Sequence, residues 1–175
     1  MKHLVYSLLF LVMTSAFIIA GTALKPVDNE GSVTFVIKNF GLNTNGSFKG
    51  LKGTINWDPS NPSASLFDVT VDAGTINTGI DLRDKDLKKE AYFDVEKYPT
   101  IHFISTKVST GNVTGNLTIK NVTKQISFPF TVKNSVNGYL FEGSFTINRE
   151  DFGVGGNSMV LSDEATVKLK VQANP

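Results

Sequence analysis

Two arginines are the side chains of this sequence best suited to binding a polar group. Arg83 and Arg149 are the only arginines among 17 basic residues, and the rest are lysines. The guanidinium group of arginine is planar and always charged, so it can hold a carboxylate or phosphate through two hydrogen bonds at once. An arginine placed beside an apolar cavity could therefore bind the head group of an amphipathic ligand.

The position of Arg149 predicts an inward orientation. It shares the strand parity of the apolar residues Phe145 and Ile147 and comes at the end of that strand, where it could bind a head group. The alternative is a structural ion pair with Asp151 or another acid, because a buried charge must be matched. Arg83 stands near the start of a predicted helix, where it could lie across the mouth of a barrel or remain in solvent.

Acidic residues cluster on the predicted helix around residues 81–90. The cluster consists of Asp81, Asp84, Asp86 and Glu90, with Lys85, Lys88 and Lys89 between them. Paired carboxylates can carry out acid–base chemistry or bind calcium, but this spacing matches no EF-hand loop. A solvated helix face with paired charges is the better interpretation, and we expect Leu82 and Leu87 to turn inward.

Catalytic and metal-binding residues are scarce. The chain contains no cysteine and two histidines, of which only His102 lies beyond the N-terminal segment. Disulfides, thiolate sites, histidine metal sites and Ser-His-Asp triads are therefore excluded or poorly supported. The parity of His102 opposes that of Ile101 and Phe103, so we expect it to face solvent. We predict no enzymatic activity, no metal and no cofactor; an enzyme acting on a lipid is the least supported alternative.

The first 23 residues are typical of an export signal. Lys2 and His3 precede an apolar run from Leu4 to Ala20, and small residues follow at 21–23. A helix of this run would span roughly 25 Å, slightly short of a bilayer core. We predict cleavage after residue 23, a single domain at 24–175 and a periplasmic or secreted location. An uncleaved anchor is the alternative.

The mature chain alternates between apolar and polar residues with a period of two, which is typical of half-buried strands. The clearest inward parities are those of Val113, Gly115, Leu117 and Ile119; Ile126, Phe128, Phe130 and Val132; Phe141, Gly143, Phe145 and Ile147; and Ala165, Val167, Leu169 and Val171. Weaker alternation occurs in 33–38, 51–58, 67–72 and 101–103. About eight antiparallel strands of this kind imply a sandwich or a closed barrel.

The apolar faces of these strands predict the interior of the barrel. We expect it to be lined by Phe35, Ile55, Trp57, Phe67, Val69, Phe103, Leu117, Phe128, Phe145 and Val167. Plain core packing is the alternative role for each of them. A membrane barrel with the opposite polarity is disfavoured, because the polar faces are rich in Lys and Thr and the aromatic residues form no girdles. With near-neutral charge, nothing points to nucleic acid.

Several motifs in order resemble the YceI-like family of exported bacterial proteins. They are Thr78-Gly79-Ile80-Asp81-Leu82-Arg83-Asp84-Lys85-Asp86-Leu87, Tyr92-Phe93-Asp94-Val95-Glu96-Lys97-Tyr98-Pro99-Thr100-Ile101, Gly115-Asn116-Leu117-Thr118-Ile119 with Val122-Thr123-Lys124, and Ile147-Asn148-Arg149-Glu150-Asp151-Phe152-Gly153. The resemblance covers roughly residues 31–172. Asp86 departs from the pattern, because the family usually has histidine there; a different ligand head group would follow if that histidine binds one.

The resemblance implies an extended, lipocalin-like barrel of eight antiparallel strands with a short helical excursion around residues 81–90. It also implies a ligand such as a polyisoprenoid, a quinone or another amphipathic lipid in the lumen, with Arg83 and Arg149 among the ligand-binding residues. We therefore expect an exported carrier or sequestering protein that spans no membrane after signal cleavage and could form a homodimer. The alternative is a stress-response or interaction module with a filled barrel and no bound lipid.

Overall fold

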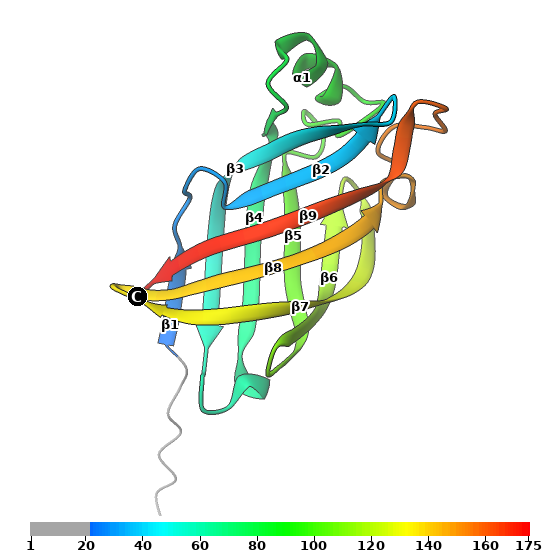
Figure 1. The fold of residues 1–175 in the computed structure, drawn as a ribbon. Helices are drawn as coiled ribbons and strands as arrows, with labels where there is room; N and C mark the ends of the chain where they lie inside the picture. Colours follow the sequence, from blue (N-terminus) through cyan, green and yellow to red (C-terminus); the bar gives the residue numbers. More distant parts are fainter. Residues whose placement is uncertain (1–21) are drawn as a thin grey trace, which may run out of the picture.

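The computed structural model describes residues 22–175 and is built almost entirely of antiparallel strands (Figure 1). The strands are β1 (Thr22–Pro26), β2 (Val33–Asn39), β3 (Leu42–Trp57), β4 (Leu66–Asn77), β5 (Thr100–Ser109), β6 (Asn112–Ile119), β7 (Val122–Ser135), β8 (Gly138–Asn148) and β9 (Leu161–Asn174). The helices are α1 (Asp81–Leu87) and the 3-10 turns η1 (Pro62–Ala64) and η2 (Glu150–Phe152).

Eight long strands close into a barrel. Their order is β3-β2-β9-β8-β7-β6-β5-β4, and pairing between β3 and β4 completes the circle. This confirms the predicted eight-stranded antiparallel barrel. Closure leaves none of these strands as a free sheet edge along its whole length, which is one way that β proteins avoid unwanted pairing.

The short strand β1 was not predicted. It pairs with the last residues of β3 and with the end of β9, so it occupies the gap left below β2. Leu24 on this strand is fully buried. The predicted signal peptide lies outside the described residues except for Thr22 and Ala23, which belong to β1, so its cleavage stays a prediction.

Alternating burial along the strands follows the predicted parity. In β6 every second residue is buried, from Val113 to Ile119. Two inward glycines make room for aromatic rings on the neighbouring strands. A Cβ atom at Gly46 would lie 2.2 Å from the Phe35 ring, and one at Gly115 would lie 2.5 Å from the Phe103 ring. At these two positions the phenylalanine ring occupies the space that the missing glycine side chain leaves.

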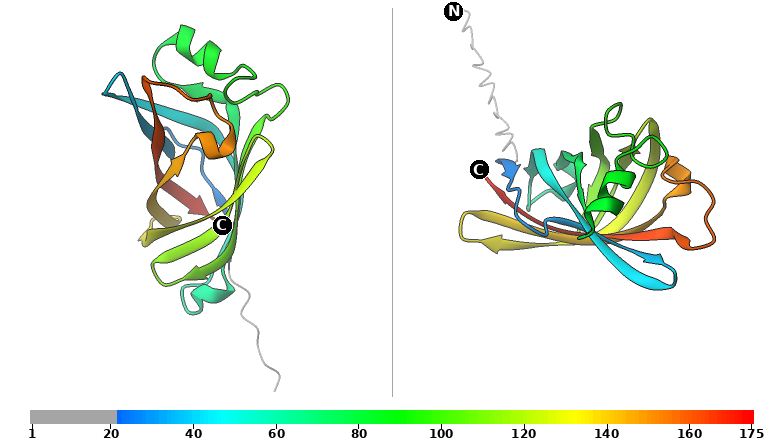
Figure 2. Two further views of the ribbon diagram at one scale, coloured as in Figure 1. Left: turned by 90° about the vertical axis from the view of Figure 1, so that its right-hand side faces the viewer. Right: turned by 90° about the horizontal axis from the view of Figure 1, so that it is seen from above.

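The helical excursion covers one end of the barrel, and Figure 2 shows α1 there from two further sides. Leu87 packs against the interior as predicted. The prediction for Leu82 was wrong, because its side chain is 73% exposed. A helix of only seven residues turns a narrow face toward the barrel, and Leu87 and Arg83 occupy that face. In residues 22–175, no helix is long and apolar enough to span a bilayer.

Candidate functional site

A cavity of about 240 Å³ runs inside the barrel. Its lining is dominated by apolar side chains from every strand of the closed circle, and it includes eleven of the twelve site residues predicted from the sequence. These are Phe35, Ile55, Phe67, Val69, Arg83, Phe103, Leu117, Phe128, Phe145, Arg149 and Val167. Apolar surface of this kind favours a hydrocarbon ligand, because each methylene that leaves water contributes about 0.8 kcal/mol.

Strand register brings the predicted wall residues together. Val167 on β9 lies between Phe35 on β2 and Phe145 on β8, so these three form one row across adjacent strands. A second row consists of Val69, Phe103 and Leu117 on β4, β5 and β6. The ring of Phe128 bridges the two rows, with centroid distances of 5.7 Å to Phe103 and 4.7 Å to Phe145.

Trp57 is the one predicted wall residue that does not line the cavity. It lies at the closed end, where its ring packs edge-on against Phe130 and Phe141 and tilted against Phe67. Its Nε1–H is buried without a hydrogen-bond partner among the described residues. The two-residue alternation correctly predicted that this ring points inward. Because Trp57 is the last residue of β3, it packs with Phe67, Phe130 and Phe141 in a cluster that we call the aromatic plug, and it is not part of the ligand wall.

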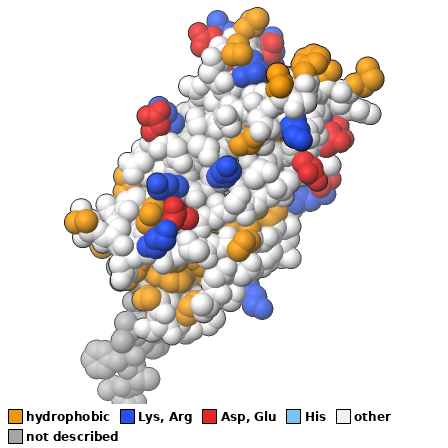
Figure 3. Space-filling view, viewed as in Figure 1, with side chains coloured by type: hydrophobic (Ala, Val, Ile, Leu, Met, Phe, Trp, Pro, Cys, Tyr) orange, Lys and Arg blue, Asp and Glu red, His pale blue; other side chains and the backbone are white. Residues whose placement is uncertain are grey.

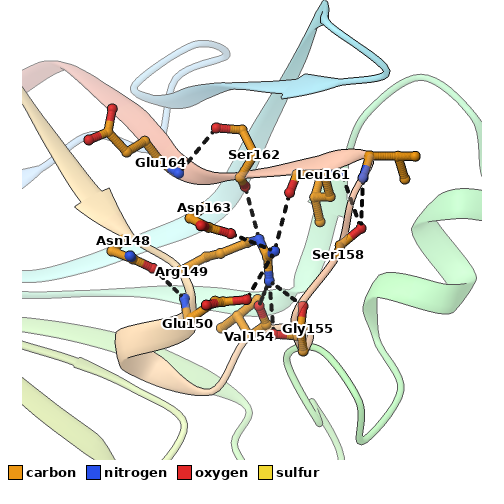
Figure 4. A network of polar contacts seen from close by, with 12 residues as sticks. Asn148, Arg149, Glu150, Val154, Gly155, Ser158, Leu161, Ser162, Asp163 and Glu164 are labelled. Atoms are coloured by element: carbon orange, nitrogen blue, oxygen red, sulfur yellow. Dashed lines mark hydrogen bonds and ion pairs between the residues drawn. The ribbon is translucent and has the colours of Figure 1, made fainter.

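Arg149 is held by the protein itself (Figure 4). It is 4% exposed, and its Nη1 donates to the carbonyl oxygens of Val154, Gly155 and Gly156 at 2.9–3.0 Å. Its Nε donates to the Ser162 carbonyl at 2.9 Å. With five buried N–H donors committed in this way, the guanidinium group is not free for a ligand.

The acids around Arg149 complete the network. Its Nη2 lies 3.1 Å from the Asp163 carboxylate and 3.5 Å from that of Glu150, and it also donates to the Leu161 carbonyl. These contacts favour the structural alternative for Arg149, with Asp163 in place of Asp151 as its partner, and its head-group role stays a prediction. Asp151 lies 3.9 Å from Lys124 instead. The arginine clamps the segment between η2 and β9 onto the barrel.

Arg83 differs from Arg149 because the protein uses only some of its hydrogen-bond donors. It is half-buried at the mouth of the cavity, where its Nε donates to Thr78 Oγ1 at 2.7 Å and its Nη2 to the Thr78 carbonyl at 2.9 Å. Thr78 in turn donates to the Asp84 carboxylate through its hydroxyl and its backbone N–H. Within residues 22–175, the Arg83 Nη1 has no hydrogen-bond partner and no carboxylate lies within ion-pair distance. Arg83 is thus fixed at the mouth with donors left for a ligand.

The structure adds wall residues that the sequence reasoning missed. Phe93 follows α1 and lies over the interior, with its ring centroid 5.5 Å from that of Phe48. Phe48 stacks in turn on Phe35, also at 5.5 Å. The Tyr92-Phe93 pair was visible as an aromatic motif, but it stands outside any strand, so parity gave no direction for it.

The polar outer face holds the remaining candidates. His102 lies there as predicted, and its Nε2 is 2.7 Å from the Asp68 carboxylate. On β7 and β8, Lys133 Nζ donates to the Glu142 carboxylate at 2.7 Å, and this hydrogen bond lowers the pKa of Glu142. No group of three or more metal-ligating side chains occurs in the described part of the chain.

A closed antiparallel barrel whose apolar cavity is plugged at one end and lined by a free arginine at the other defines a lipocalin-like binding barrel. The chain belongs to the family of YceI-like domains, whose family model matches residues 25–173. It is 35% identical to a UPF0312 protein of Pseudomonas syringae pv. tomato over 168 residues, covering 86% of this chain and 88% of that protein.

Solved structures agree with this assignment. BcnA of Burkholderia cenocepacia is 25% identical, with a TM-score of 0.75 over 85% of this chain and 94% of that one. A polyisoprenoid-binding domain from Saccharophagus degradans has a TM-score of 0.70 over 86% of this chain and 97% of that one. Its identity of 16% means that this second likeness supports the fold alone.

Proposed function

We propose that this protein is an exported, non-enzymatic carrier or sequestering protein for a polyisoprenoid, a quinone or another long amphipathic lipid. The apolar chain would lie along the barrel, and the head group would lie at the mouth beside Arg83. The observation that carries the proposal is the apolar cavity that ends at an arginine with free donors. A domain of the same fold is named for polyisoprenoid binding, which makes this the ligand class to test first.

The proposal places the protein in the periplasm or outside the cell. This rests on the predicted signal peptide and on the resemblance to exported proteins. Burial of an extended lipid would be driven by about 0.8 kcal/mol per methylene, so a long chain could bind tightly without any catalytic group.

An interaction module with a filled barrel is the second candidate. It is favoured by the aromatic plug, in which Trp57, Phe67, Phe130 and Phe141 already fill the closed end. Native mass spectrometry with lipid extraction, on protein purified from its own cell envelope, separates the two. A discrete bound lipid mass is expected for the carrier. A clean ligand-free mass, with no uptake of added quinone or prenyl lipid, would favour the filled barrel.

Replacing Arg83 with glutamine is expected to weaken binding of a prenyl phosphate about tenfold, because a charge-assisted hydrogen bond at the mouth is lost. Binding of the prenyl alcohol of equal length should change much less. Isothermal titration of both ligands measures the difference. Lys85→Gln, an exposed change on the same helix, is the matched control. Equal losses for phosphate and alcohol would contradict the head-group role of Arg83.

A further inference from the structure

Large apolar side chains are exposed around the mouth of the barrel. Phe40 and Leu42 at the tip between β2 and β3 are 75% and 74% exposed, and Met159 before β9 is fully exposed. Ile80 and Leu82 at α1 and Val160 beside Met159 are also exposed. We call Phe40, Leu42, Ile80, Leu82, Met159 and Val160 the apolar rim. In Figure 3, hydrophobic side chains stand out at this end of the molecule.

The apolar rim is continuous with the cavity. The backbone N–H of Phe40 donates to the Val160 carbonyl at 2.8 Å, so the β2–β3 tip and the segment before β9 are joined. Phe40 and Leu42 line an open hollow together with Thr78 and Arg83. Thr78 and Arg83 also line the cavity, so the hollow is the vestibule of the cavity, and two of the six rim residues, Phe40 and Leu42, belong to its wall.

Phe40 has a backbone conformation that is unfavourable for a bulky side chain. It has a φ of 51°, and Gly41 after it has a φ of 75°. A two-residue hairpin tip with two positive φ angles favours Asn-Gly, because bulky side chains are strained in this region. An exposed phenylalanine at the strained position therefore gains nothing for the fold, and residues that break a local rule in this way are typical of functional surfaces.

The charges of the two rim loops suit a phospholipid surface. Residues 38–45 and 153–162 contain one charged side chain, the basic Lys38, and no acid. Anionic head groups would therefore meet no repulsion from these loops. The third rim segment, at α1, is charged with both signs, since Asp81 stands between Ile80 and Leu82 and the helix carries three acids and two basic residues.

We propose that the apolar rim docks the barrel mouth onto a phospholipid bilayer, with the side chains at the β2–β3 tip inserted among the head groups. The docking proposal rests on the proposed lipid-binding function, because docking would serve the transfer of a lipid into the cavity. A lipid that moved directly between bilayer and cavity would avoid exposing its chain to water, an exposure whose cost rises with every methylene. The strength of interfacial membrane binding increases with the apolar area that is buried, and an anchor of limited apolar area binds reversibly.

The test is flotation of the full mature protein with vesicles of phosphatidylethanolamine and phosphatidylglycerol. The wild type should float with the vesicles. The double variant Phe40→Asn/Leu42→Ser should partition about tenfold less, since burial of two large side chains is lost. Val136→Ser is the matched control, because Val136 is a fully exposed apolar residue at the β7–β8 tip of the opposite end. It should float as the wild type does.

Phe40→Asn alone adds a readout that a structural role would not give. It should raise the free energy of unfolding, because asparagine tolerates the positive φ, while vesicle binding falls. If the wild type did not float, or if the double variant floated equally well, the docking proposal would be wrong. If instead the variants converted a dimer to a monomer in sedimentation, without vesicle binding by the wild type, a second copy would be the partner and the proposal would also fail.

A parallel measurement separates this proposal from the proposed function. Uptake of monomeric prenyl alcohol from dilute solution, without vesicles, is compared for the wild type and for Met159→Ser, a rim variant whose residue lines neither the cavity nor the vestibule, and the two should agree. Failure of the wild type to take up the alcohol would overturn lipid binding. Intact uptake without vesicle binding would overturn membrane docking alone.

Discussion

Replacing Phe145 with arginine is expected to abolish lipid uptake. The Phe145 ring lies in the row with Phe35 and Val167 and is 4.7 Å from the ring of Phe128. An arginine there would put a charge in the middle of the apolar cavity, where it would lose hydration and obstruct the path of a hydrocarbon chain. We expect affinity for a prenyl alcohol to fall by roughly 100-fold or more, as measured by titration in solution.

Thr146→Arg is the matched control for this change. Thr146 is the next residue on β8 and faces outward, where its hydroxyl lies 3.1 Å from that of Thr166. The outward arginine should leave uptake unchanged. Because Phe145→Arg could also weaken folding, near-UV circular dichroism must show native packing, and Phe145→Leu should keep most of the uptake. A folded Phe145→Arg protein with normal uptake would show that the lipid does not occupy this cavity.

Replacing Arg149 with methionine should produce the largest loss of stability. The change removes donors from the carbonyl groups of residues 154–156, 161 and 162 and leaves several of them unsatisfied in a buried position. Removing one partner from such a network typically costs about 3–5 kcal/mol. Urea unfolding of the mature protein measures the free energy directly. Arg149→Lys should recover little, because one ammonium group cannot reach five acceptors.

Arg83→Met provides the comparison for Arg149. Arg83 donates only to Thr78 in the described structure, so its loss should lower the free energy of unfolding by less than about 1 kcal/mol. Similar effects of the two changes would contradict the distinction between a structural and a ligand-binding arginine. A ligand-binding defect without loss of stability is expected for Arg83 alone.

The two arginines also show where sequence reasoning stops. Both were candidates for a head-group site, and parity correctly turned Arg149 inward. Apart from Glu150, the acceptors that contact Arg149 belong to residues 154–163, whose path over the barrel depends on the whole fold. The free donors of Arg83 depend in turn on the position of Thr78 and Asp84 relative to α1.

Patterns among neighbouring residues were sufficient to predict the strands, their inward faces and hence an apolar interior. The residues of a strand that face inward follow from its own two-residue alternation, so they can be predicted without knowing which strands pair with it. Features that depend on contacts between distant segments became visible only in the folded barrel. Closure placed β1 between β3 and β9, moved Trp57 into the plug and left Leu82 in solvent. It also brought the apolar rim together from two loops and helix α1, which are far apart in the chain, because strand pairing and loop packing are set by long-range contacts.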